Sequence, residues 1–134
     1  MLITDFQYYE ESKDYVSQYS GIDYPLHQRL GPNGWFENYQ IQDFDYKFNS
    51  WGFRGPEYDQ YIGKPINICL GDSFTVNLGG PIEHSWSSHL QEYFNIPTLN
   101  LGMDGACNDA IRIVYDRAMR MFDVQHAFVM YSYF

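Results

Sequence analysis

The sequence is short of basic residues and of long hydrophobic runs. Among its 134 residues, 8 are Lys or Arg and 17 are Asp or Glu, which gives a formal net charge of −9 at pH 7. So acidic a chain has no basic surface for phosphates, and we expect neither nucleic-acid nor membrane-surface binding. No apolar run reaches the ~18 residues of a transmembrane helix, and the N-terminus lacks the features of a signal peptide. These absences predict a soluble, intracellular protein, cytoplasmic in the simplest case.

Cysteines are also scarce. Cys69 and Cys107 are too few for a disulfide framework and lack the spacing of a metal-binding pair, so we expect a reducing compartment and no metal or other cofactor. Cys69 is predicted to be a core residue. Cys107 is predicted to be a small residue where a glycine loop meets a helix, and not a nucleophile.

The length favours one domain, residues 1–134, in two parts. Residues 1–64 are predicted to form an irregular or extended aromatic-rich arm, with a short helix over 6–19. Within this arm, alternating apolar residues predict one or two antiparallel strands, an extended arm or hairpin, at Tyr39, Ile41, Phe44, Tyr46 and Phe48.

Residues 65–134 alternate between buried-strand and amphipathic-helix patterns. Strands are predicted at 66–70, 97–101 and 124–133, and helices at 85–94 and 108–122. This alternation is typical of a parallel sheet with right-handed crossovers, so the expected fold is an α/β core of three parallel strands, β-α-β-α-β.

The first strand of this core runs directly into Gly71, Asp72 and Ser73, in the stretch "CLGDSFT". A parallel strand that ends in this way presents the serine at the carboxyl edge of the sheet, where open α/β folds place their ligands. The same three residues are also ordinary turn chemistry, in which the serine hydroxyl and the Asp72 carboxylate cap a turn or a helix. Both interpretations of Ser73 stay open at this point.

Here the sequence resembles the SGNH or GDSL-type hydrolases, whose first signature block is a strand ending in Gly-Asp-Ser. Upstream, "FNSWGFRGPEY" resembles the segment that precedes this block in some members, and downstream "EHSWSSHLQEYF" resembles the helix that follows it. The stretch "LNLGMDGACNDA" resembles the second block. The resemblance covers about residues 49 to 134.

The resemblance implies a flavodoxin-like half of an SGNH hydrolase that cleaves acyl or acetyl esters of small molecules or carbohydrates, without a cofactor or metal. It implies a catalytic role for Ser73 as the nucleophile and for Gly105 at the oxyanion hole, where the backbone N–H groups of both residues would meet the developing oxyanion. It gives supporting roles to Asp72, Gly71 and Asn100.

The third block of the family, Gly-x-Asn-Asp after the third strand, is not found. Asn108 and Asp109 in "GACND" lie one residue too far from Gly105 and follow the second strand. Asn108 is better interpreted as the N-cap of the following helix.

The fifth block, a late Asp-x-x-His whose histidine activates the serine, is not found either. "DVQH" at 123–126 fits its letters, but His126 would lie at the start of the third strand, ~15 Å or more from Ser73. A general base must approach within about 3 Å of its proton, so we reject His126. His84 is then the candidate nearest to Ser73 in sequence, while His27 and His89 are expected to be surface or capping residues.

Two functions therefore stay open. The chain could be the N-terminal portion of an ester hydrolase, incomplete in isolation, whose base comes from residues absent here or from a second polypeptide. Alternatively it could be a catalytically silent structural or assembly subunit with the same ancestry. A truncated gene would give the same sequence features as such a subunit. Arg54 could be a surface cation, pin the aromatic arm or meet an anionic substrate group, and we favour a structural role. The open edge of the last strand predicts a homo-oligomer or a second polypeptide that completes the sheet.

Overall fold

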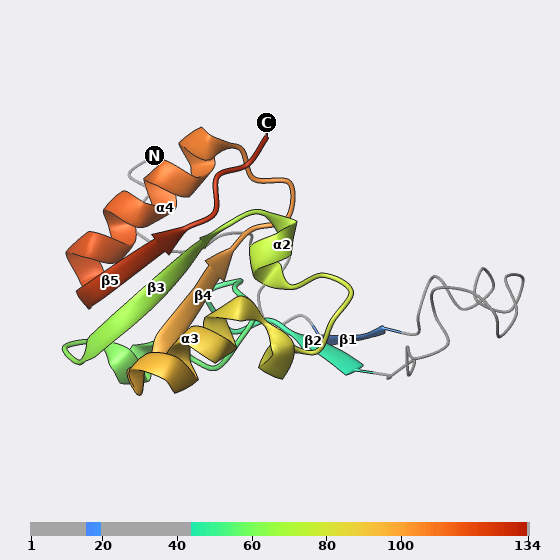
Figure 1. Ribbon diagram of the computed structural model, residues 1–134, viewed down its shortest axis with the longest axis horizontal. Coiled ribbons are helices and arrows are strands. Elements are labelled where there is room, and N and C mark those ends of the chain that lie inside the picture. Colours follow the sequence, from blue (N-terminus) through green and yellow to red (C-terminus); the bar gives the residue numbers. More distant parts are fainter. Residues whose placement is uncertain (1–15, 20–43, 134) are drawn as a thin grey trace, which may run out of the picture.

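The computed structural model describes residues 16–19 and 44–133 (Figure 1). In chain order its elements are β1 (Val16–Tyr19), β2 (Phe44–Lys47), the short 3₁₀ turn η2 (Asp59–Tyr61), β3 (Pro65–Gly71), α2 (Ser73–Val76), the 3₁₀ turn η3 (Ile82–His84), α3 (Trp86–Phe94), β4 (Thr98–Gly102), α4 (Asn108–Met121) and β5 (Asp123–Val129).

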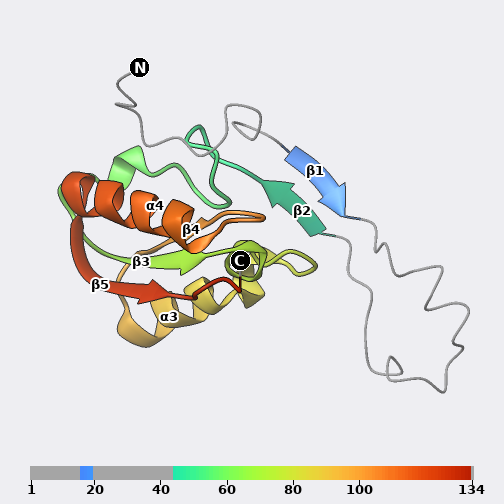
Figure 2. The ribbon, with the colours of Figure 1, turned by 90° about the horizontal axis from the view of Figure 1, so that it is seen from above.

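The centre of the fold is a parallel sheet with the strand order β4-β3-β5, and α4 and α3 cover its opposite faces (Figure 2). Strand β3 is buried from Ile66 to Gly71 because it has a neighbour on each side and a helix over each face. In α4 the buried residues Ile111, Val114 and Ala118 recur at helical spacing and form the face that packs on the sheet. The predicted α/β class with three parallel strands and two covering helices is confirmed.

Residues 48–64 pack closely against this sheet. The side-chain amide of Asn49 holds their loop, because its Oδ1 accepts hydrogen bonds from the N–H groups of Trp51 and Phe53 and its Nδ2 donates to the carbonyl of Pro56. Phe53 and Tyr58 are fully buried, belong to the main hydrophobic core and stack with their ring centroids 6.1 Å apart. This segment therefore contributes rings to the same core as β3.

The antiparallel pair β1–β2 corrects the predicted helix over 6–19. Residues Val16–Tyr19 form a strand that pairs with Phe44–Lys47, so a partner distant in sequence outweighs the weak local helical pattern. The strand predicted around Tyr46 is confirmed, while residues 6–15 and the alternation at Tyr39 and Ile41 lie outside the described residues.

Other differences concern strand ends and one added helix. Strand β5 ends at Val129 and not at residue 133, because beyond Met130 the backbone of Ser132 bonds to the side chain of Asn108 and not to β3. The short helix α2 was not expected from the pattern. Within residues 16–19 and 44–133, no helix has both the length and the apolar character that a membrane crossing would need.

Candidate functional site

Ser73 lies where the central strand meets a helix. Strand β3 ends at Gly71, and α2 begins at Ser73 with Asp72 as its N-cap, whose side chain accepts a hydrogen bond of 3.1 Å from the N–H of Phe74. Ser73 is half-buried, and no described residue forms a hydrogen bond with its hydroxyl. Asp72 therefore acts as a capping carboxylate, while the serine hydroxyl is unengaged within the described part of the chain.

Two glycines allow α2 to lie directly on the ends of β3 and β4. A Cβ at Gly71 would collide with Oγ1 of Thr75 and would meet Met130 at 3.1 Å. A Cβ at Gly102 would come within 2.5 Å of the backbone nitrogen of Val76. Because side chains at these positions would push α2 away, the two glycines fix the height of Ser73 above the sheet edge.

Asn100 anchors the same region from β4. Its Nδ2 donates to the carbonyl of Thr75 at 2.7 Å and to the hydroxyl of Ser87 at 3.2 Å, and its Oδ1 accepts from the N–H of Gly102 at 3.0 Å. Its backbone carbonyl accepts the Tyr58 hydroxyl at 2.7 Å. The side chain is 5% exposed and its amide is committed to these contacts, so Asn100 positions α2 and α3 around the strand end.

Gly105 lies in the loop that follows β4, at the same sheet edge as Ser73 because β3 and β4 run parallel. Its φ is +68°, and a Cβ there would meet no atom within 4 Å. The N–H of Met103 donates to the carbonyl of Gly71 at 3.0 Å, which ties this loop to the end of β3. Within the described residues, neither the Ser73 N–H nor the Gly105 N–H donates a hydrogen bond, so both donors are available.

The described histidines lie away from Ser73. His126 pairs with Asn67 near the start of β3, its Nδ1 lies 3.0 Å from Oδ1 of Asn67, and its ring stacks on Phe94. About 20 Å of strand separates Asn67 from Ser73, which confirms that His126 lies far from the serine.

The other histidines do not provide the base within the described structure. His84 ends η3 and is exposed, and His89 is exposed on α3 with Glu92 4.0 Å away. His27 lies outside the described residues. No described imidazole therefore contacts the serine hydroxyl.

The predicted capping role of Asn108 is wrong. The N-cap of α4 is Cys107, and Asn108 is the first helical residue, with Asp109 in the first turn. Nδ2 of Asn108 donates to the carbonyl of Ser132, and its Oδ1 accepts from the N–H of Ser132, both at 2.9 Å. An amide can form this reciprocal pair with one backbone residue, so Asn108 anchors the segment after β5 and is not free to serve as an oxyanion donor.

Arg54 pins the loop after α2, as the sequence predicted for a structural cation. Its guanidinium is buried and donates to the carbonyls of Val76, Asn77 and Gly80 at 3.1, 2.7 and 2.9 Å. It also lies 4.3 Å from the ring centroid of Tyr46. Burial lowers the pKa of this guanidinium and raises the pKa of the Cys69 thiol to about 12, so the thiol in the sheet is not a nucleophile.

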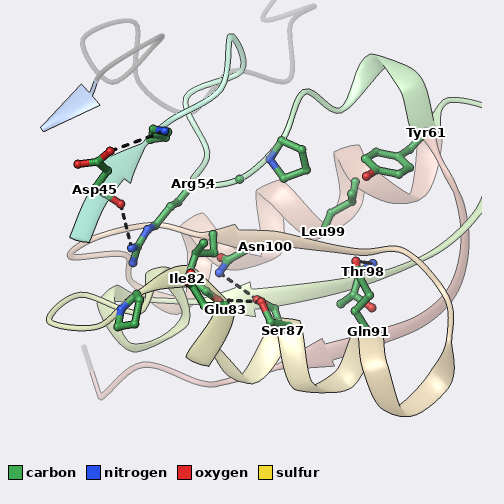
Figure 3. A pocket seen from close by; sticks show the side chains of 15 residues that line it. Asp45, Arg54, Tyr61, Ile82, Glu83, Ser87, Gln91, Thr98, Leu99 and Asn100 are labelled. Atoms are coloured by element: carbon green, nitrogen blue, oxygen red, sulfur yellow. Dashed lines mark hydrogen bonds and ion pairs between the residues drawn. The ribbon is translucent and has the colours of Figure 1, made fainter. Parts of the chain in front are cut away.

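A cleft of about 780 Å³ opens beside β4 (Figure 3). Its walls come from β2, residues 54–56, η2, residues 81–83, α3 and β4, and neither Ser73 nor Gly105 lines it. Charged side chains at its rim include Lys47 and Glu83. The sequence carried no motif for this cleft, because its polar residues are scattered over five segments.

The described residues contain no cluster of three or more His, Cys, Asp or Glu side chains that could hold a metal ion. The chain matches no family model, no curated protein and no solved structure. A functional conclusion therefore depends on the arrangement at the carboxyl edge of the sheet.

Proposed function

We propose that this chain is the nucleophile-bearing portion of an SGNH/GDSL-like serine ester hydrolase, with Ser73 as the attacking group. One observation carries the proposal. Ser73 and Gly105 follow the carboxyl ends of adjacent parallel strands, and both keep a backbone N–H unused within the described residues. Acyl transfer needs a nucleophile and hydrogen-bond donors for the oxyanion, and this sheet edge offers one nucleophile and two donors.

The strand order supports the same conclusion. The first strand of the core lies between the second and the third, since the order is β4-β3-β5. Flavodoxin-like sheets begin with this order and bind ligands at the switch point beyond the carboxyl ends of their strands. Ser73 follows the central strand and so occupies that point.

The chemistry would proceed in two steps. The Ser73 oxygen bonds to the ester carbonyl carbon, and the carbonyl oxygen takes up negative charge opposite the N–H groups of Ser73 and Gly105. A base takes the Ser73 proton and passes it to the alcohol that the intermediate expels. Water then attacks the acyl group, gives a proton back to Ser73 through the same base and releases the carboxylic acid. Each oxyanion donor is worth roughly 10²–10³ in turnover in comparable sites.

The base that removes the serine proton is the part that the described residues do not supply. Loss of the base in a serine hydrolase costs up to about 10⁶ in turnover, because nucleophile and base act as a unit. We propose that the base comes from outside the described residues, either from residues absent here or from a second polypeptide. The substrates would be short acyl esters, acetyl esters included, of small molecules or carbohydrates, and the reaction uses no cofactor.

The test is p-nitrophenyl acetate hydrolysis by the tagged chain, both pure and isolated together with the proteins that bind it in its source cells. We expect Ser73→Ala to abolish hydrolysis in the sample that contains the base, and Ser88→Ala, a control serine on α3, to leave it unchanged. His27→Ala decides whether the base belongs to this chain. The proposal is wrong if no sample shows hydrolysis that depends on Ser73.

A catalytically silent assembly subunit is the second candidate, and one observation favours it. Asp72, Gly71 and Asn100 are all engaged in shaping the strand ends, and no described imidazole contacts Ser73. These contacts would be retained for packing alone. In this case Ser73→Ala would leave every hydrolytic rate unchanged.

A further inference from the structure

The two edges of the parallel sheet differ in how they are covered. In β4, residues 97 and 103 face β3, because the carbonyl of Pro97 accepts from Asn67 and the N–H of Met103 donates to Gly71. Thr98, Asn100 and Gly102 alternate with them, so their backbone groups point to the outer edge. Side chains occupy that edge: Gln91 accepts from the Thr98 N–H, the Tyr58 hydroxyl donates to the Asn100 carbonyl, and the Asn100 side chain accepts from the Gly102 N–H.

The edge formed by β5 has no such cover among the described residues. The N–H of Met130 donates to the carbonyl of Leu70 at 2.8 Å, and both backbone groups of Ser132 bond to the Asn108 side chain. The backbone groups of Ala127, Val129 and Tyr131 therefore lie on the opposite side of this strand and its extension. Within residues 16–19 and 44–133, no hydrogen bond reaches the backbone of these three residues. One long edge of the sheet is therefore ready to pair with another strand.

The same edge extends beyond β5, and its last exposed side chains are large hydrophobic or aromatic ones. The reciprocal bonds between Asn108 and Ser132 hold the segment after β5 against the start of α4. Val129 is 38% exposed, Tyr131 is 77% exposed and Tyr133 is fully exposed. Natural edge strands usually carry charges or proline against pairing, and residues 124 to 133 contain no Asp, Glu, Lys, Arg or Pro.

We infer that the β5 edge is a dimer interface, at which a second copy of this chain pairs antiparallel with Val129 facing the second copy's Val129. An edge that pairs with its own copy across a two-fold axis forms a closed dimer and leaves this edge covered in both molecules. The two sheets would join into one with the strand order β4-β3-β5-β5-β3-β4.

Side-chain size and charge favour this register. With Val129 on the two-fold axis, the small Ala127 lies opposite the large, exposed Tyr131 of the second copy, so each ring has room. The charged residue of the strand, Asp123, lies at its far end. The two Asp123 carboxylates would be separated by about 40 Å, well beyond the Debye length of about 10 Å. Parallel pairing of the two edges would instead place the carboxylates side by side.

This interface does not depend on the proposed hydrolase activity, because Ser73 follows the central strand and not the edge strand. The test is sedimentation equilibrium of the full chain and of its variants Val129→Lys and Val129→Glu. Each variant is measured alone, and the two are then measured as an equimolar mixture. Val129 is partly exposed, so both variants should fold, which circular dichroism checks. Ile113→Lys, at a 46% exposed position on α4, is the matched control.

We expect the unmodified chain and Ile113→Lys to dimerise with the same dissociation constant. Val129→Lys and Val129→Glu alone should each weaken the dimer by about tenfold or more, because like charges would face each other across the axis. The equimolar mixture should return to within about threefold of the unmodified chain. A monomeric chain, a dimer that neither Val129 variant weakens, or a mixture without recovery would overturn the inference.

Discussion

The buried guanidinium of Arg54 forms three hydrogen bonds that join residues 44–64 to the loop after α2. Arg54 is 1% exposed and donates from Nη1 to the Val76 and Asn77 carbonyls and from Nη2 to the Gly80 carbonyl. Arg54→Met keeps the length of the side chain and removes all of these donors. The loop that follows α2 would then lose its three bonds to Arg54, while the N–H of Gly79 would still donate to the Tyr46 hydroxyl at 2.7 Å.

The expected loss follows from how well water can replace each bond. Hydrogen bonds to a charged donor contribute about 1.5–3 kcal/mol each. Asn77 and Gly80 are half-buried, so water can reach their carbonyls in part, whereas Val76 is buried. Removing the cation also removes its desolvation cost. We therefore expect Arg54→Met to lower the free energy of unfolding by about 3 kcal/mol, and not by the sum of the three bonds.

Urea unfolding followed by tryptophan fluorescence measures this change. Arg112→Met is the control, because Arg112 is exposed and its ion pair with Asp116 spans 3.7 Å, so its loss should cost at most about 1 kcal/mol. Arg54→Lys should fall between the two, since an ammonium keeps the charge without the planar fork. Equal stability of Arg54→Met and Arg112→Met would refute the role assigned to Arg54.

Three further predictions concern the strand ends and the thiols. Gly102→Ala should lower the free energy of unfolding by about 2 kcal/mol in the same urea assay, because the new Cβ meets the backbone of α2. In Gly105→Ala the new Cβ meets no atom, so the free energy of unfolding should fall by only about 1 kcal/mol, through the positive φ of this residue. Asn108→Ala should cost about 1–2 kcal/mol and speed amide exchange after β5; unchanged exchange there would contradict the anchoring role. Only the exposed Cys107 should react with a thiol reagent in the native chain, whereas both cysteines should react in urea. Burial raises the pKa of the Cys69 thiol from 9.0 to about 12. The contribution of the Cys69 thiol to stability should therefore be complete below about pH 9 and decline as the pH rises from 9 to 12. Rapid native modification of Cys69 would contradict its burial.

The core was predictable because its patterns are local. The apolar run from Ile66 to Leu70 and the helical spacing of Ile111, Val114 and Ala118 each suffice to define an element, and alternation of such elements defines a parallel sheet. The pair β1–β2 was not predictable in this way, because 24 residues separate its two strands, and its stability depends on that distant pairing and not on a local pattern.

The candidate site was predictable in its order along the chain but not in its contacts. That Ser73 and Gly105 share a sheet edge follows from the parallel arrangement of β3 and β4. The short helix α2 depends on the cap formed by Asp72 and on the missing side chain at Gly102, which hydrophobic periodicity does not register. The bonds between Asn108 and the segment after β5 likewise join residues whose proximity only the folded sheet creates.

The assignment of Ser73 as a nucleophile is tested most directly by fluorophosphonate labelling of the tagged chain in lysate from its source cells, mapped by peptide mass spectrometry. We expect one adduct, on Ser73, that disappears when the chain is unfolded in urea before labelling. Ser73→Ala should remain unlabelled under native conditions, while Ser88→Ala should label like the unmodified chain. An unlabelled Ser73 in the native lysate, or labelling confined to other residues, would contradict the account.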